Sequence, residues 1–257
     1  MNVGSYCQEV SETIYFHSLL GLGTANEVIL PMKFSIIIPT LNEQKTIASC
    51  LFPLQPLRDN CEIIIVDATD GQPVVPAALA DKIISSEKGR ARQMNLGASH
   101  ASGDMLIFLH ADTHLPEHVL QLIEQHINYK QWGRFDIQLS GDHFMLKVIA
   151  WMMNLRSRLT GIATGDQVIF VTKEAFAAAG QYPEIALMED IALSKALNKI
   201  SPPVCLSAKV TSSGRRWKRY GIYRTILLMW SLRLRYFFGA DPQLLAALYS
   251  KGQFWKP

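Results

Sequence analysis

The sequence predicts an α/β protein built on a doubly wound, mostly parallel sheet flanked by helices, followed by a helical C-terminal segment. From residue 32 to about residue 139, short apolar runs alternate with longer helical patterns, which is typical of such a sheet. The apolar runs are continuous in Ile, Val and Leu, as expected for strands that are buried on both faces.

The first half contains most of the expected strands. We expect strands at residues 34–38, 62–66, 82–85, 105–109 and 134–139, and helices at residues 43–57, 89–101 and 116–129. Asn42 suits the N-cap of the first helix. Pro116 suits the first turn of the third expected helix, where its missing N–H has no consequence.

The second half is predominantly helical, and the regular alternation of strands and helices ends near residue 140. We expect helices at residues 144–158, 173–179, 189–199, 219–238 and 242–251, with short strands ending at residue 171 and covering residues 204–207. The main domain is expected to cover residues 32–220. Residues 1–31 would form an N-terminal extension outside the core, and residues 221–257 would form basic amphipathic helices.

Charge is distributed unevenly along the chain. The net charge is +3, yet residues 205–257 contain ten basic residues and one acidic residue. Residues 144–155 and 222–238 are apolar but include lysine or arginine, and neither reaches the roughly 18 uninterrupted apolar residues of a spanning helix. Basic amphipathic helices bind the interface of anionic membranes, which would suit a lipidic ligand. The alternative is that they pack on the sheet and on each other.

Composition argues against several other classes of protein. Aromatic residues of the basic segment recur at helical spacing beside Leu and Ile, which favours packing over nucleic-acid binding. The four cysteines lie far apart without a Cys-x-x-Cys pair, so neither a zinc cage nor a disulfide framework is indicated. Residues 1–31 contain no lysine or arginine, so the basic start of a secretory signal is missing and we expect a cytoplasmic protein.

Polar clusters follow three of the expected strands, at the point where each strand ends. These residues are Pro39, Asn42, Glu43, Asp67, His110 and Asp112. The carboxyl ends of parallel strands share one edge of the sheet, and ligands of open α/β sheets bind there. Carboxylates at this edge of a nearly neutral protein predict a divalent cation that holds a phosphorylated ligand.

Individual residues of these clusters have different expected roles. His110 and Asp112 are alternate residues at a strand end, so their side chains share one face. Asp112 would bind Mg²⁺ or Mn²⁺ through its carboxylate, and His110 would hydrogen-bond the ligand. The alternative is that Asp112 belongs to a capping turn before Pro116. Asp67 either accepts a hydrogen bond from a nucleobase ring N–H or caps its own turn.

Three further clusters lie near expected helix starts. Arg92 lies in the first turn after Gly89, where arginine and backbone N–H groups bind anions, although a solvated basic turn is the alternative. The Glu189–Asp190 pair precedes an apolar helix; it provides a general base or simply suits the positive end of the helix. The Arg216–Trp217 pair suits closure over a diphosphate leaving group or belongs to a basic surface.

In this order, over residues 33–220, the motifs resemble those of the family-2 glycosyltransferases. The resemblance implies a GT-A fold, a nucleotide-diphosphate sugar donor, a divalent metal (Mn²⁺ or Mg²⁺) and inversion at the anomeric carbon. It also implies a nucleotide half up to about residue 140 and an acceptor half after it. The nucleotide-sugar-binding positions would be Pro39, Asn42, Glu43, Asp67, Arg92, His110, Asp112, Arg216 and Trp217.

Two of the family's catalytic motifs match particular residues of this chain. Asp112 matches the metal-binding aspartate of the family's Asp-x-Asp motif. Asp190 matches the base of the Glu-Asp pair, in which Glu189 is the first member. The resemblance therefore implies that Asp190 deprotonates an acceptor while the metal and an arginine stabilise the leaving diphosphate.

The chain departs from the family pattern at two positions. His110 replaces the first aspartate of Asp-x-Asp, and Ser213 stands where the glutamine of the Gln-x-x-Arg-Trp element of processive members would be. The chain looks most like a small single-transfer subgroup whose members often carry names as carotenoid-acid (diaponeurosporenoate-like) glycosyltransferases. Such a protein would transfer sugar to a hydroxyl or carboxyl group. We expect that its acceptor is lipidic and that it contacts the inner face of the cell membrane peripherally.

Two other functions share some of these features. A sugar-nucleotide nucleotidyltransferase would use a similar sheet and metal, but it usually has a glycine-rich basic loop after the first strand, and that glycine is missing here. A non-catalytic nucleotide-sugar-binding module would keep Asp67 and Asp112 but would not need Asp190.

Overall fold

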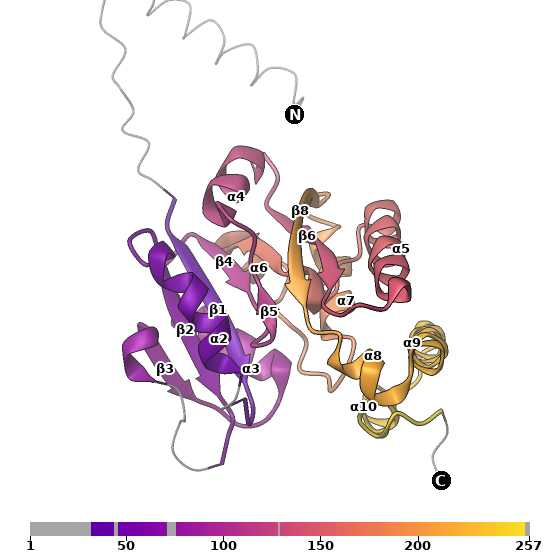
Figure 1. Cartoon of the computed structure of the whole chain (residues 1–257). Coiled ribbons are helices and arrows are strands. Elements are labelled where there is room, and N and C mark those ends of the chain that lie inside the picture. Colours follow the sequence, from indigo (N-terminus) through magenta and orange to yellow (C-terminus); the bar gives the residue numbers. More distant parts are fainter. Residues whose placement is uncertain (1–31, 44–45, 71–75, 128, 255–257) are drawn as a thin grey trace, which may run out of the picture. The chain divides into compact units, whose positions relative to one another are not determined.

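The computed structural model describes residues 32–43, 46–70, 76–127 and 129–254 (Figure 1). The expected N-terminal extension, residues 1–31, lies outside the described residues. One eight-stranded sheet has the order β3-β2-β1-β4-β7-β6-β8-β5. Its strands are β1 (Phe34–Thr40), β2 (Cys61–Asp67), β3 (Lys82–Ser85), β4 (Met105–Phe108), β5 (Thr113–His114), β6 (Trp132–Leu139), β7 (Ile169–Thr172) and β8 (Val204–Ser212).

The sheet confirms the predicted fold class. Strands β1 to β4 pair in parallel, and β6 pairs in parallel with β8, whereas β7 and β5 are antiparallel to their neighbours. The carboxyl ends of β1, β2 and β4 therefore lie at one edge, with Thr40 opposite Asp67. The two-residue strand β5 was not predicted, because its pairing with β8 comes from a distant part of the chain and leaves no local pattern.

Helices cover both faces of the sheet, as the continuous apolar strands predict. They are α2 (Ile47–Leu51), α3 (Arg90–Ser99), α4 (Val119–Ile127), α5 (Phe144–Thr160), α6 (Lys173–Ala178) and α7 (Glu189–Leu197), with short 3₁₀ segments η1 (Phe52–Leu57), η2 (Ala77–Leu79) and η3 (Gly165–Gln167). Ile36 and Ile38 pack in a core with residues of α2, α4 and α5, whereas Ile37 packs with α3, α6 and α7. Successive residues of β1 thus serve opposite faces.

The first predicted helix is shorter than expected, and its cap was predicted wrongly. Within the described residues, the α-helical part begins at Ile47 and gives way to the 3₁₀ segment η1 at Phe52. Pro53 and Pro56 lie in η1, and proline removes the N–H that an α-helical ladder needs. Asn42 has a positive φ of 56° and its backbone N–H donates to Thr69 Oγ1, so it does not cap this helix.

Within the described residues, the C-terminal part of the chain forms three helices instead of the two that were expected. The run predicted at 219–238 divides into α8 (Arg215–Tyr220) and α9 (Ile222–Phe237) at Gly221, whose φ of 83° suits glycine; α10 (Pro242–Lys251) follows. One side of α9 and α10 packs on the start of α7 through Met188, Ile191, Leu228, Leu232, Leu245 and Leu248. Among the described residues, no helix has the length and apolar content needed to cross a membrane.

Candidate active site

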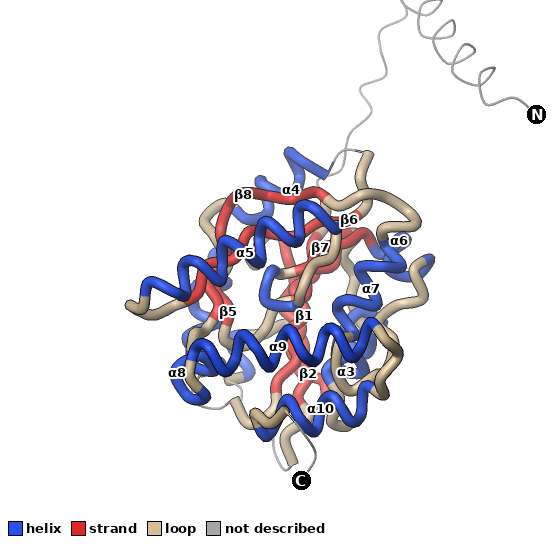
Figure 2. The backbone as a smooth tube through the Cα atoms, turned by 90° about the vertical axis from the view of Figure 1, so that its right-hand side faces the viewer, coloured by secondary structure: helices blue, strands red, loops and turns tan. Residues whose placement is uncertain are grey.

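A cavity of about 670 Å³ opens at the carboxyl ends of β4, β6 and β8. Its walls come from α5, η3, the start of α7, α8 and α9. Figure 2 shows α5 and α9 crossing the same face of the molecule. Six of the predicted site residues line this cavity: His110, Asp112, Glu189, Asp190, Arg216 and Trp217. The structure therefore brings together predicted residues from three separate parts of the sequence.

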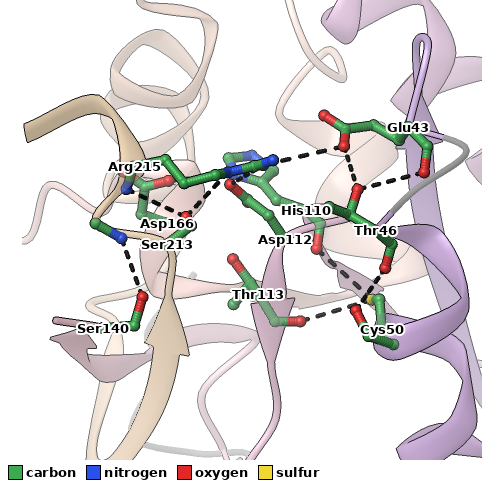
Figure 3. A network of polar contacts seen from close by, with 12 residues as sticks. Glu43, Thr46, Cys50, His110, Asp112, Thr113, Ser140, Asp166, Ser213 and Arg215 are labelled. Atoms are coloured by element: carbon green, nitrogen blue, oxygen red, sulfur yellow. Dashed lines mark hydrogen bonds and ion pairs between the residues drawn. The ribbon is translucent and has the colours of Figure 1, made fainter. Parts of the chain in front are cut away.

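His110 forms a pair with an aspartate that the sequence analysis did not identify. Its Nδ1 lies 3.2 Å from Asp166 Oδ1 (Figure 3). Burial raises the pKa of Asp166, but the hydrogen bond and charge of His110 outweigh this and bring the pKa below its ordinary value. A Cβ on Gly165 would lie 2.5 Å from His110 Nε2, so only glycine leaves room for the ring. The sequence does hold a signal for Asp166, because it is an acidic residue three positions before an apolar strand.

Asp112 is paired with a cation of the chain itself. Arg215 Nη2 donates to Asp112 Oδ2 at 3.0 Å and lies 4.0 Å from Glu43 Oε2, as Figure 3 shows. Arg215 Nε also donates to Ser213 Oγ at 3.1 Å. Glu43 is not a lining residue of the cavity, but Arg215 connects it with Asp112.

Glu189 and Asp190 have different environments at the start of α7. Asp190 Oδ2 accepts the backbone N–H of Gly165 at 2.9 Å, and its Oδ1 accepts that of Ile191 at 2.7 Å. Glu189 is buried, with Arg90 Nη1 3.6 Å from its Oε1. Burial, followed by the charge of Asp190, raises the pKa of Glu189, while Arg90 opposes the rise. Two adjacent carboxyls in unlike environments are suited to different roles.

The first two strand ends lie outside the cavity. Asp67 is buried, and its Oδ1 accepts hydrogen bonds from Thr40 Oγ1 at 3.1 Å and from Thr69 N and Oγ1 at 3.1 and 2.7 Å. This is the turn-capping geometry that was the alternative for Asp67. Pro39 and Asn42, like Asp67, are not among the lining residues.

The predicted arginines differ in their positions. Arg92 does not line the cavity and pairs with Glu87 and, at 3.0 Å, with Glu184, whereas Arg90 lines it. The guanidinium of Arg216 stacks 3.5 Å from the centroid of the Tyr249 ring and donates to the Tyr249 carbonyl. Arg216 is thereby fixed between α8 and α10.

The described residues do not form a complete metal cage, since no group of three His, Cys, Asp or Glu side chains among them converges on one point. The carboxylate of Asp112 fits a different arrangement, in which Mg²⁺ or Mn²⁺ takes one protein carboxylate and completes its shell with phosphate oxygens and water. Asp112 lines the cavity and is about one-third exposed, so it is accessible for that role.

The sheet order, the helices on both faces and the cavity at the strand ends define a GT-A fold. Solved glycosyltransferases are similar in structure over most of this chain. The mannosyltransferase PcManGT from Pyrobaculum calidifontis, in complex with GDP-Man and Mn²⁺, has a TM-score of 0.57 at 16% identity over 89% of this chain and 67% of its own. TarS from S. aureus (residues 1–349, with UDP) has a TM-score of 0.57 at 19% identity over 78% and 66%. This chain covers 40% of a longer TarS chain.

The sequence also matches a protein family. Residues 35–145 match the family described as glycosyl transferase family 2. The match confirms the resemblance that the motifs indicated, and it includes His110 and Asp112. Glu189, Asp190 and the arginines of α8 follow the matched segment.

Proposed function

We propose that this protein transfers a sugar from a nucleotide-diphosphate sugar to an acceptor hydroxyl or carboxyl, with inversion at the anomeric carbon. The observation that carries the proposal is that Asp112, in the segment that matches glycosyl transferase family 2, and Asp190, beyond that segment, line one cavity. Similar structures contain GDP-Man with Mn²⁺, UDP or UDP-GlcNAc, which supports a nucleotide-sugar donor.

The donor would lie at the Asp112 end of the cavity. Asp112 would hold a divalent ion, Mn²⁺ or Mg²⁺, and this ion would supply positive charge to the diphosphate. Arg215 contacts Asp112 and is more than half exposed, so it can move to the departing diphosphate and stabilise its charge. Trp217 would close over the same group, and Arg216 would contact it from the position in which Tyr249 holds it.

The nucleotide would extend from the diphosphate towards the first two strand ends. Pro39, Asn42 and Glu43 would contact it there, and Asp67 would read the base. The contact of Arg215 with both Glu43 and Asp112 supports this path, since it joins the first strand end to the cavity. Arg92 would contact the nucleotide from outside the cavity, and to do so it would first have to break its ion pairs with Glu87 and Glu184.

Asp190 would act as the general base. Two backbone N–H groups orient its carboxylate within the cavity, so that it is held in a defined position. It would take the proton of an acceptor hydroxyl, whose oxygen attacks the anomeric carbon opposite the leaving diphosphate. A carboxylate acceptor has no proton to lose and would not need this base, so replacing Asp190 also distinguishes the two acceptor types.

The test is a donor screen by thermal shift, with a panel of nucleotide sugars, each with and without Mn²⁺. One donor should raise the melting temperature only when metal is present; binding at 100 times Kd stabilises by about 2.7 kcal/mol. Asp112→Ala serves as the control that should lose this shift. If no nucleotide sugar stabilises the chain with or without metal, the proposal is wrong.

We also propose peripheral contact with an anionic membrane through α5 and α9. Each helix has an outward apolar stripe besides its buried side: Phe144, Trp151, Met152, Leu155 and Leu159 on α5, and Tyr223, Leu227, Trp230, Leu234 and Phe237 on α9. The stripes recur at helical spacing, so each faces one direction. The exposed basic residue Lys147 lies on α5 and Arg224 on α9.

Co-sedimentation with vesicles that contain phosphatidylglycerol tests this contact. The double variant Leu227→Glu/Phe237→Glu should lose binding, because both side chains are more than half exposed and would otherwise enter the interface. Tyr129→Glu is the matched control, since Tyr129 is a fully exposed apolar residue beyond α4. Absence of wild-type binding at low salt would exclude the membrane contact.

A further inference from the structure

Two arginines in the cavity have no partner in the described part of the chain. Arg156 comes from α5 and Arg233 from α9, and both line the cavity. Arg156 Nε and Nη2 and Arg233 Nε are buried without a hydrogen-bond partner among the described residues. Neither residue was identified from the sequence as part of the site.

The other cavity arginines each have a partner. Arg90 pairs with Glu189, Arg215 pairs with Asp112, and Arg216 donates to a backbone carbonyl of α10. The acidic side chains at the Asp112 end are therefore already engaged. Positive charge that no close ion pair neutralises remains at the α5–α9 wall.

This arrangement is unfavourable until an anion binds. Burial and the nearby charge of Arg233 lower the pKa of Arg156 to about 10, and burial lowers the pKa of Arg233. Buried donors without acceptors lose their hydration without replacement, and two guanidinium groups close together repel each other. An anion between them would accept charge-assisted hydrogen bonds and relieve both effects.

The wall around the two arginines is apolar. It is formed by Met145, Val148, Ile149, Met152 and Met153 of α5 and by Ile226, Met229 and Trp230 of α9. Met152 is 43% exposed and Trp230 is 57% exposed, so this wall continues onto the outer surface. Methionine side chains adapt to irregular apolar ligands. The site thus combines a cationic centre with an adaptable apolar lining.

We propose that Arg156 and Arg233 bind an anionic group of the acceptor, a phosphate or a carboxylate, while an apolar part of the acceptor lies along the α5–α9 wall. The inference rests on the proposed glycosyl transfer. The acceptor is favoured over the donor because both arginines interact electrostatically with Asp190, the proposed base. The donor diphosphate has its own arginine next to Asp112.

The test uses calorimetric titration of the full chain with hexyl phosphate, hexanoate, hexanol and inorganic phosphate, and with the nucleoside diphosphate of the donor found in the screen. At least one hexyl anion should bind, and hexanol should bind at least tenfold more weakly. Arg156→Gln and Arg233→Gln should each weaken anion binding at least tenfold and change nucleoside diphosphate binding less than twofold. Arg235→Gln, on the same helix but outside the cavity lining, should bind like the wild type.

Several outcomes would overturn the inference. If neither hexyl anion binds, the arginines do not serve the acceptor. The same conclusion follows if the two glutamine variants weaken the binding of the nucleoside diphosphate as much as they weaken the binding of the anion. If inorganic phosphate binds as tightly as hexyl phosphate, the proposed contact between the acceptor's apolar part and the α5–α9 wall is refuted. Failure of the proposed function looks different: hexyl anions would bind, but no nucleotide sugar would.

A stability measurement separates ligand binding from a structural role. Because Arg156 and Arg233 have no hydrogen-bond partner among the described residues, Arg156→Met and Arg233→Met should keep or raise the melting temperature while anion binding is lost. A clear fall in melting temperature for both variants would show that the arginines support the fold instead, and would contradict the inference.

Discussion

Asp190→Asn is the substitution that tests the proposed mechanism most directly. Asparagine has nearly the same shape as aspartate but cannot take a proton from an acceptor. It also retains only one acceptor oxygen, whereas Asp190 accepts N–H groups with both of its oxygens, from Gly165 at 2.9 Å and from Ile191 at 2.7 Å. The substitution therefore removes the proposed base and one of two hydrogen bonds.

The two effects differ in size. Loss of a hydrogen bond to a charged group costs about 1.5–3 kcal/mol of folding stability. For a domain of this length that lowers the melting temperature by roughly 3–12 °C, which leaves the protein folded at 25 °C. Loss of a general base lowers the rate about 10²- to 10⁴-fold. The rate should thus fall far more than the folded fraction.

The assay measures release of nucleoside diphosphate from the donor identified in the screen, together with calorimetric binding of that donor. We expect Asp190→Asn to bind the donor within about threefold of the wild type and to lose at least about 100-fold in turnover. Asp59→Asn, at an exposed position outside the cavity, is the matched control. Turnover of Asp190→Asn at the wild-type rate with a hydroxyl acceptor would refute the assignment of the base.

Three further substitutions test other parts of the structure. Asp112→Ala should abolish metal-dependent donor binding in calorimetry, yet change stability by less than about 1 kcal/mol because its ion pair is partly exposed; unaltered heats would exclude its metal role. Gly165→Ala should displace the ring of His110, which a Cβ would approach to 2.5 Å, and weaken donor binding; normal binding would show that this ring position is not needed. Glu62 is partly buried, which raises its pKa, but hydrogen bonds led by that of Lys82 outweigh this and lower the pKa to about 2. Its stabilising effect is therefore present above pH 4.5 and lost as the pH falls towards 2, and Glu62→Gln should reduce the slope of acid unfolding in that window, as followed by circular dichroism; an unchanged slope would contradict the shift.

The sequence predicted the parts of the site that follow local rules. Continuous apolar strands ending in polar residues placed His110 and Asp112 correctly at a strand end, because strand period and strand end are both local. Glu189 and Asp190 were found for the same reason, at the start of an apolar helix. The role of Asp67 was left open: its hydrogen bond from Thr40 depends on pairing between distant strands, whereas that from Thr69 lies within its own turn.

The remaining parts depend on packing between elements that are far apart in sequence. Asp166 becomes a site residue only because η3 lies beside the end of β4. Arg156 and Arg233 lie on helices whose sequence pattern indicates a basic amphipathic surface. The direction in which an arginine on such a helix points is decided by its neighbours, so the pattern alone did not distinguish an inward arginine from a solvated one.

The inward arginines change how the basic tail should be understood. Of the ten basic residues counted between positions 205 and 257, Arg215, Arg216 and Arg233 line the cavity. In the proposed function their charge would serve ligands within the site and contribute less to attraction towards an anionic membrane. The outer surface of α9, by contrast, carries an apolar stripe that includes Leu227 and Trp230. Membrane contact through this face would therefore depend more on apolar insertion than on charge, and it should weaken only modestly as salt rises. A lipid-like acceptor entering between α5 and α9 would meet this apolar surface first and Arg156 and Arg233 afterwards.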